Sequence, residues 1–121
     1  MTAILLVALG AALGAPARYL TDRLIQARHD SVFPWGTLAV NVAGSFLLGL
    51  LAGLPVSEPV MAAAGVGFCG ALTTYSTFGY ETLRLAQGRA RFYAAANTAA
   101  SILAGLGAAS CGLTLAQALT T

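Results

Sequence analysis

Residues 67–78 read GFCGALTTYSTF, and this stretch decides how the hydrophobic sequence around it folds. Gly65, Gly67 and Gly70 precede four serine or threonine residues that share positions 73–77 with Tyr75. Glycine loosens a helix and β-branched threonine loses rotamer freedom in one, so helix propensity is low here. In hydrocarbon, a backbone carbonyl freed from a helix is unfavourable unless protein, water or an ion satisfies it. The stretch therefore predicts a broken membrane helix whose break lines a functional site.

The composition of the whole chain predicts an all-α integral membrane protein. Of its 121 residues, 58% are hydrophobic and only 8% are charged, which is too little polar surface for a soluble domain of this size. Four long stretches lack charge, except for Arg18 in the first, and each can hold a bilayer-crossing helix of about 20 residues. We predict a single four-helix membrane domain over residues 1–121, with spans at about 3–20, 35–54, 60–86 and 92–118 and a polar loop from Thr21 to Pro34.

The charged and thiol side chains argue against several classes of function. A formal net charge of +2, without a basic cluster, does not favour nucleic acid binding. Cys69 and Cys111 lie in separate predicted spans without a CxxC spacing, so we expect them to be packing residues. Because the sequence shows no nucleophile–base pair or metal-ligand cluster, we do not expect an enzyme. The N-terminus lacks a basic segment, so we do not expect a cleaved signal peptide.

Small and polar residues recur every four positions in the second and fourth predicted spans, and residues at this spacing share one face of a helix. The stripes comprise Asn41, Ser45, Gly49 and Gly53 in the second span and Asn97, Ser101, Gly105 and Ala109 in the fourth. An asparagine within hydrocarbon must find partners, either across helices or along a polar path, and spacing alone leaves both open. Two such stripes beside a broken helix indicate a narrow hydrogen-bonding track through the bundle.

Three further features each have a structural and a functional interpretation. Arg18, near the end of the first span, either extends to the lipid headgroups or attracts anions at the mouth of a vestibule. Glu81, near the end of the third span, is either interfacial or hydrogen-bonded inside the bundle. Tyr75 and Phe78 are three residues apart and would share a helix face, where ordinary packing is the alternative to a role in the track.

Three motifs together resemble the fluoride channels of the Fluc (CrcB) family over nearly the whole chain. They read GAPARYL at 14–20, GTLAVNVAGSFLLGLL at 36–51 and GFCGALTTYSTFGYET at 67–82. The resemblance implies a channel that passively exports fluoride across the bacterial cell membrane and so lowers its cytoplasmic concentration. It also implies an antiparallel, dual-topology dimer of four-helix subunits. Such a dimer would have two fluoride pores at the subunit interface and a structural sodium ion at its centre.

The resemblance also implies roles for individual residues. Gly70 and Thr73 match the break residues whose backbone carbonyls bind the sodium ion in each subunit. Asn41 and Ser101 match hydrogen-bond donors of the pore, and four residues match positions that support the vestibule and the track, namely Arg18, Thr77, Glu81 and Asn97. Tyr75 and Phe78 match a pair of phenylalanines beside the pore. The chain departs from the family pattern at Tyr75, at Asn97, where tyrosine is expected, and at Gly105, where a serine can occur.

These residue types suit fluoride, a small and strongly hydrated ion that accepts strong hydrogen bonds. Asn41 and Ser101 supply N–H and O–H donors that can replace its water. Aromatic ring edges carry partial positive charge that attracts an anion. A narrow track with few donors would disfavour the larger chloride ion.

Two other membrane functions are alternatives. Small multidrug transporters also have four short spans, but they exchange protons through an acid in the first helix, and no acid precedes Asp22 here. A non-conducting partner subunit would explain the glycine stripes but not the TTYST sequence.

All six arginines fall in or beside the first and third connections, so the positive-inside rule favours one orientation. An antiparallel dimer would then need a second, non-identical family member, and a homodimer is the alternative.

Overall fold

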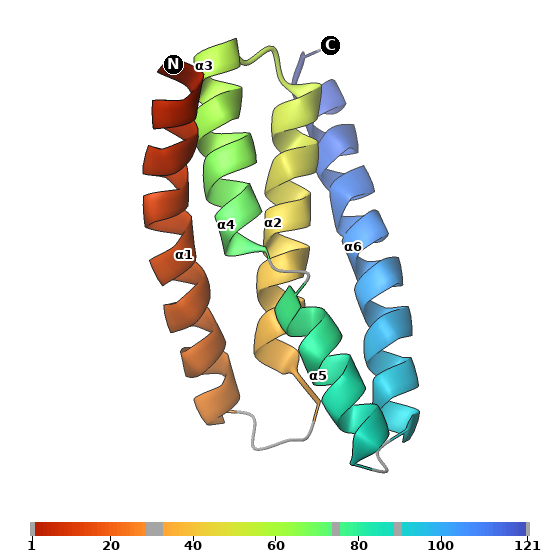
Figure 1. Ribbon diagram of the computed structural model, residues 1–121. Helices are drawn as coiled ribbons and strands as arrows, with labels where there is room; N and C mark the ends of the chain where they lie inside the picture. Colours follow the sequence, from red (N-terminus) through yellow and green to blue (C-terminus); the bar gives the residue numbers. More distant parts are fainter. Residues whose placement is uncertain (1, 29–32, 74–75, 89–90, 121) are drawn as a thin grey trace.

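The structure, a computed structural model, describes residues 2–28, 33–73, 76–88 and 91–120, and its regular elements in these ranges are all helices (Figure 1). In chain order they are α1 (Thr2–Arg28), α2 (Trp35–Gly53), α3 (Glu58–Val60), η1 (Met61–Cys69), α4 (Gly70–Leu72), α5 (Ser76–Gln87) and α6 (Arg91–Thr120). The elements α3, η1 and α4 follow one another without a break, and we call this helical segment, Glu58–Leu72, the α3–α4 rod.

Three helices, α1, α2 and α6, are long and apolar enough to cross a membrane. Their apolar windows are only 11% buried in α1 and α6 and 28% buried in α2. Most residues of α2 are at least partly covered, whereas most residues of α1 and α6 are exposed on the single chain. Leu13, Leu103 and Leu106 are examples, with about two thirds or more of their surface exposed. Such surfaces need lipid or another apolar partner. The chain is therefore a multi-pass membrane protein.

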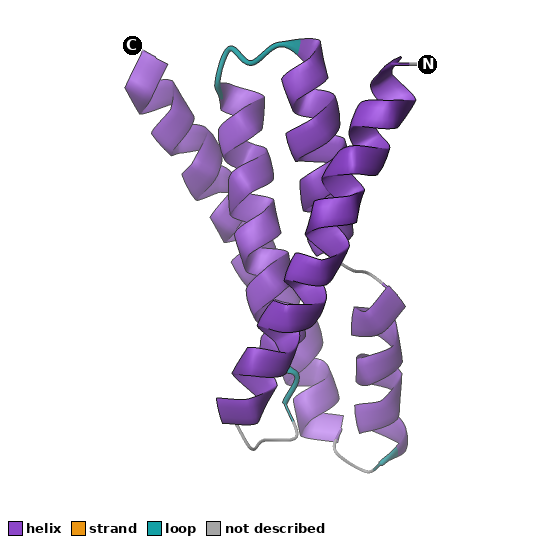
Figure 2. Ribbon diagram, turned by 90° about the vertical axis from the view of Figure 1, so that its left-hand side faces the viewer, coloured by secondary structure: helices purple, strands orange, loops and turns teal. Residues whose placement is uncertain are grey.

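Glycines bring the helices together in two close pairs, α1 with the α3–α4 rod and α2 with α6 (Figure 1). A Cβ on Gly10 of α1 would overlap the carbonyl oxygen of Ala63 in the rod. In the second pair, a Cβ on Gly112 of α6 would overlap the carbonyl oxygen of Phe46 in α2. In a membrane, the hydrophobic effect does not drive helices together, because lipid tails are as apolar as the side chains. Small residues let the helices approach closely, so that van der Waals packing can hold them together. Seen after a quarter turn, the two chain ends splay apart at one end of the bundle (Figure 2).

The first helix is longer than the sequence predicted. α1 continues to Arg28, through residues 21–28 that were predicted to belong to a polar loop. The extra turns are supported by side-chain contacts, because Nη1 of Arg23 donates to the hydroxyl of Tyr19 at 3.0 Å and its guanidinium lies 5.7 Å from the ring centroid. Oε1 of Gln26 also accepts a hydrogen bond from the amide of Gly36 at 3.0 Å. Polar composition thus marked the end of the apolar surface rather than the end of the helix.

Helical backbone lies on both sides of the TTYST sequence. The rod ends at Leu72, Thr73 is extended with φ −82° and ψ 158°, and α5 begins at Ser76. Thr74 and Tyr75 lie outside the described residues. At the end of the rod, both the amide and the hydroxyl of Thr73 donate to the carbonyl of Cys69, at 3.0 and 2.9 Å. In Figure 1, α5 runs obliquely to the rod and lies beside α6.

The middle of the rod, η1, is wound as a π-helix, which the sequence did not predict. Its winding shows in the bond from the amide of Gly70 to the carbonyl of Gly65, five residues earlier. Five of its nine residues are alanine or glycine, so little side-chain volume separates η1 from α1. π-Helical turns are rare and frequently lie at functional sites.

Candidate functional site

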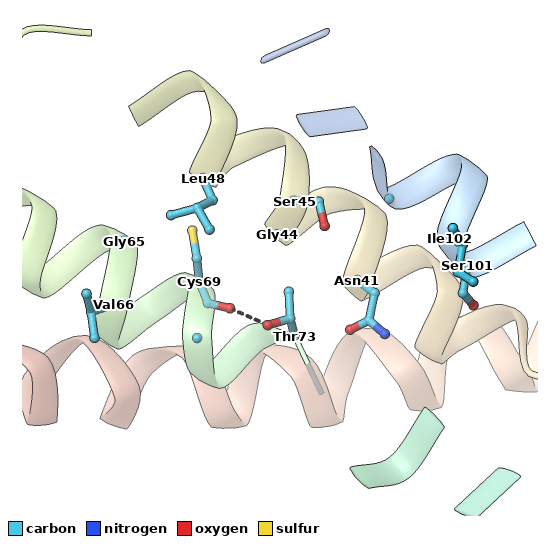
Figure 3. Close-up of a pocket in the computed structure, with 12 residues that line it drawn as sticks. Asn41, Gly44, Ser45, Leu48, Gly65, Val66, Cys69, Thr73, Ser101 and Ile102 are labelled. Carbon is cyan, nitrogen blue, oxygen red and sulfur yellow. Dashed lines mark hydrogen bonds between the residues drawn. The ribbon is translucent and has the colours of Figure 1, made fainter. Parts of the chain in front are cut away.

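A pocket of about 530 Å³ lies between α2, the α3–α4 rod and α6 (Figure 3). Residues of all three elements line it: Asn41, Gly44, Ser45 and Leu48 from α2, Gly65, Val66, Cys69, Gly70 and Thr73 from the rod and its end, and Ser101, Ile102 and Gly105 from α6. The structure thus brings two residues of each stripe, Asn41 and Ser45 of α2 and Ser101 and Gly105 of α6, to one place with the end of the rod. The polar side chains that line the pocket are those of Asn41, Ser45, Thr73 and Ser101, and the remaining lining residues are glycines, Cys69 and aliphatic residues. The pocket therefore holds few hydrogen-bonding side chains.

The α2 side of the pocket carries Asn41 and Ser45, one helical turn apart on the same face (Figure 3). Gly44 lies beside them and is buried, and a Cβ at this position would overlap Cγ2 of Thr73. This glycine therefore lets the end of the rod approach α2. The close approach places Thr73 next to the two polar side chains of α2.

The α6 side of the pocket is joined to α5 by a short chain of hydrogen bonds. Oγ of Ser101 donates to Oδ1 of Asn97 at 3.4 Å, and Nδ2 of Asn97 donates to Oγ1 of Thr82 at 2.8 Å. Asn97 is only 1% exposed and does not line the pocket itself. It therefore connects Ser101 of α6 to Thr82 of α5 through two hydrogen bonds.

Two other residues singled out in the sequence lie outside this pocket. Glu81 accepts a hydrogen bond from Oγ1 of Thr37 at 2.6 Å, which favours the interpretation in which it is bonded inside the bundle. Arg18 is half-buried on α1, two residues after Pro16.

Three of the sequence-predicted site residues have no described side chain. Thr77 and Phe78 lie in α5, but nothing is described of their side chains, and Tyr75 lies outside the described residues altogether.

The end of the rod suits a hard cation. In the described part of the chain, no three His, Cys, Asp or Glu side chains come together, so a metal ion here would depend on backbone oxygens. The last carbonyls of a helix have no partner within it, and the helix dipole makes this end negative. Gly70 is exposed, and nothing lies within 4 Å of the position that a Cβ would occupy. Gly70 and Thr73 are the residues at this end whose carbonyl oxygens would hold a sodium ion, and this role stays a prediction.

The structure adds two polar residues to those that the sequence singled out. Thr37 lies four residues before Asn41, so extending the α2 stripe back by one turn would have found it. Thr82 is the partner of Asn97, and no spacing in the sequence points to it.

Comparison with known proteins agrees with this architecture. Residues 5–113 match the family model described as CrcB-like protein, Camphor Resistance (CrcB). A protein of Frankia casuarinae is 59% identical and one of Streptomyces avermitilis is 60% identical, each over 95% of this chain and 96% of its own length. Both carry the name Fluoride-specific ion channel FluC 1. A protein of Rhodococcus jostii named Fluoride-specific ion channel FluC 2 is 49% identical over 93% of the chain.

These names describe ion channels and not enzymes, which agrees with the absence of an enzyme motif in the sequence. The family match covers residues 5–113 and therefore includes all three motifs quoted above. The chain belongs to the CrcB-like family of membrane proteins, in which the resemblance of its sequence had placed it.

Proposed function

We propose that the chain forms a fluoride-selective channel that lets fluoride leave the cell passively and so lowers its cytoplasmic concentration. The observation that carries the proposal is the joint lining of one pocket by Asn41 and Ser101, from two apolar membrane helices. Identity of about 60% to proteins named fluoride-specific channels supports the choice of ion.

The chemistry of the pocket explains the selectivity that we propose. Fluoride must exchange its water for other donors, and the Asn41 amide provides N–H groups. The Ser101 hydroxyl is proposed to supply an O–H by turning from Oδ1 of Asn97, to which it donates at 3.4 Å, toward the ion. With so few donors in an apolar surrounding, larger and weaker acceptors such as chloride are disfavoured. Tyr75 and Phe78 are proposed to contribute aromatic groups to the path, and Arg18 to attract the anion to its mouth. Thr77, Glu81 and Asn97 are proposed to support the path.

We further propose that the functional unit is an antiparallel dimer of single-domain, four-span subunits. The third of the four spans is the α3–α4 rod continued by α5, interrupted at the TTYST sequence. Val66 and Ile102 line the pocket yet are 61% and 53% exposed, which is expected if a second subunit covers them. That subunit is either a second copy or another member of the family. A structural sodium ion, held by the carbonyls of Gly70 and Thr73 from both subunits, would join the two chains at the centre.

Ion efflux from liposomes tests the channel function. Purified protein in liposomes loaded with fluoride or with chloride should release fluoride but retain chloride, without a proton or sodium gradient. Protein-free liposomes set the background leak. A flux that depends strictly on an imposed cation gradient would contradict the channel in favour of a coupled transporter. Absence of any fluoride flux, from a chain that elutes as an intact dimer, would contradict conduction by this chain alone.

A further inference from the structure

We propose that Ser45 is a further hydrogen-bond donor in the ion path, a role that rests on the proposed fluoride channel function. Ser45 lines the pocket one turn after Asn41. Figure 3 shows its hydroxyl on the same side of α2 as the Asn41 amide. Residues four apart in a helix are separated by about 6 Å along its axis. Two donors at this spacing would let a fluoride ion pass from one to the other without regaining its full water shell.

The hydroxyl of Ser45 is available for such a role. Serine and threonine within helices often donate to the carbonyl four residues earlier, as Thr73 and Thr98 do in this chain at 2.9 and 3.0 Å. Ser101 likewise donates to Asn97. Ser45, by contrast, makes no hydrogen bond with any residue that the structure describes. A hydroxyl without a partner in an apolar environment is unfavourable, so Ser45 should bind whatever polar species enters the pocket.

The opposite wall of the pocket leaves room beside this hydroxyl. Gly105 of α6 faces Ser45, and the serine Oγ lies 3.8 Å from the position that a Cβ on Gly105 would occupy. Outside α6 itself, no other atom of the described residues lies within 4 Å of that position. The space next to Oγ is therefore bounded by a glycine, and it can admit a small ion. The same space can also admit a serine at position 105 without a clash.

Moving the hydroxyl from one wall to the other tests the proposal. Ser45→Ala should slow fluoride efflux about two- to tenfold, the range expected for one lost hydrogen bond. Ser45→Ala/Gly105→Ser, which returns a hydroxyl to the same space from α6, should recover most of the rate. Ser45→Ala/Gly105→Ala adds the carbon but no hydroxyl and should not. Ser110→Ala, at an exposed position of α6 outside the pocket, is the control and should conduct like the wild type.

The measurement separates slower conduction from loss of folded protein. The fraction of liposomes that empty reports how many contain an active channel, whereas the rate of emptying reports conduction per channel. Ser45→Ala should lower only the rate. Ser45→Cys, which keeps the size but has a weak donor, gives a second variant with the same expectation. Wild-type rates in both Ser45→Ala and Ser45→Cys would overturn the role of Ser45 while leaving the channel function in place. Absence of flux in the wild type, both alone and together with a paralogue, would overturn both.

Discussion

Oγ1 of Thr37 in α2 donates a 2.6 Å hydrogen bond to Oε1 of Glu81 in α5, across 44 positions of sequence. Thr37 is 3% exposed and Glu81 is half-buried, so the bond is partly shielded from solvent. The neighbouring amide of Gly36 donates to Oε1 of Gln26 in α1. The first turn of α2 is therefore tied to two other helices, and the Thr37–Glu81 bond fixes where α5 lies after the TTYST sequence.

Removal of this hydroxyl should weaken the bundle. Thr37→Val keeps the shape of the side chain but leaves Glu81 without its donor, and a hydrogen bond to a carboxylate contributes about 1.5–3 kcal/mol. We expect a lower thermal unfolding temperature in detergent, measured by circular dichroism. Thr37→Ser keeps the hydroxyl and should stay close to the wild type. In a double-mutant cycle with Glu81→Ala, which removes the acceptor, additive effects would show that the two side chains do not interact.

The close approach of α2 and α6 should be sensitive to one methyl group. A Cβ on Gly112 would overlap the carbonyl of Phe46 and lie 2.8 Å from the amide of Leu50, so Gly112→Ala must push the helices apart. We expect a destabilisation of about 1–3 kcal/mol, as for other overpacked sites. Gly107→Ala on the same helix is the matched control, because its Cβ would meet nothing within 4 Å. Equal unfolding temperatures for the two variants would contradict this packing.

The four-residue repeats allowed the sequence to predict which side chains share the pocket. Asn41 and Ser45 on α2 and Ser101 and Gly105 on α6 all line it. The other members of the two stripes, Gly49, Gly53, Asn97 and Ala109, do not line it. Helical periodicity fixes which side chains share a face, but it does not fix which part of that face borders the pocket. Their role in carrying an anion stays a prediction, as do the roles of Tyr75, Thr77 and Phe78. The sodium ligands also stay a prediction, although the end of the rod fits them.

Contacts that cross between helices could not be predicted in the same way. The partner of Asn97 is Thr82, and that of Glu81 is Thr37, and both pairs depend on how α5 is rotated relative to α2 and α6. One residue more or less between Leu72 and α5 would rotate α5 by about 100°, since a turn holds 3.6 residues. Local propensity shows that the helix is weak at this point but does not set that rotation. The π-helical winding of η1 likewise has no signature in the sequence.

A negative charge at Asn41 should block fluoride. Asn41→Asp replaces an amide that donates hydrogen bonds by a carboxylate that only accepts them, at a position lining the pocket. We expect fluoride efflux to fall by at least about tenfold, the factor that corresponds to 1.4 kcal/mol. The elution volume of the dimer should stay unchanged, and Ser110→Ala is again the control. Efflux at the wild-type rate would assign Asn41 to helix packing alone.

The distribution of arginines predicts how the chain inserts and pairs. The described arginines lie toward the end of the bundle where α1 ends and α6 begins, whereas both chain ends and Glu58 lie at the opposite end (Figure 1). A chain that inserts equally in both orientations needs nearly balanced charges, and this one has none of its six arginines at the end that carries the termini. The positive-inside rule therefore favours one orientation, with the arginine-bearing end in the cytoplasm.

Accessibility of terminal tags tests this orientation. With a cysteine-containing tag on either terminus of a chain whose own Cys69 and Cys111 are replaced by alanine, an impermeant thiol-reactive reagent should label intact cells but add little further label once the membrane is opened. Replacing Arg23 and Arg28 by glutamine weakens the charge bias, and this variant should label more evenly from the two sides.

If the wild type has a single orientation, an antiparallel dimer requires another family member of opposite bias. Co-expression with such a paralogue should then yield a mixed dimer on purification. Equal labelling of the wild-type chain from both sides would instead support an antiparallel homodimer.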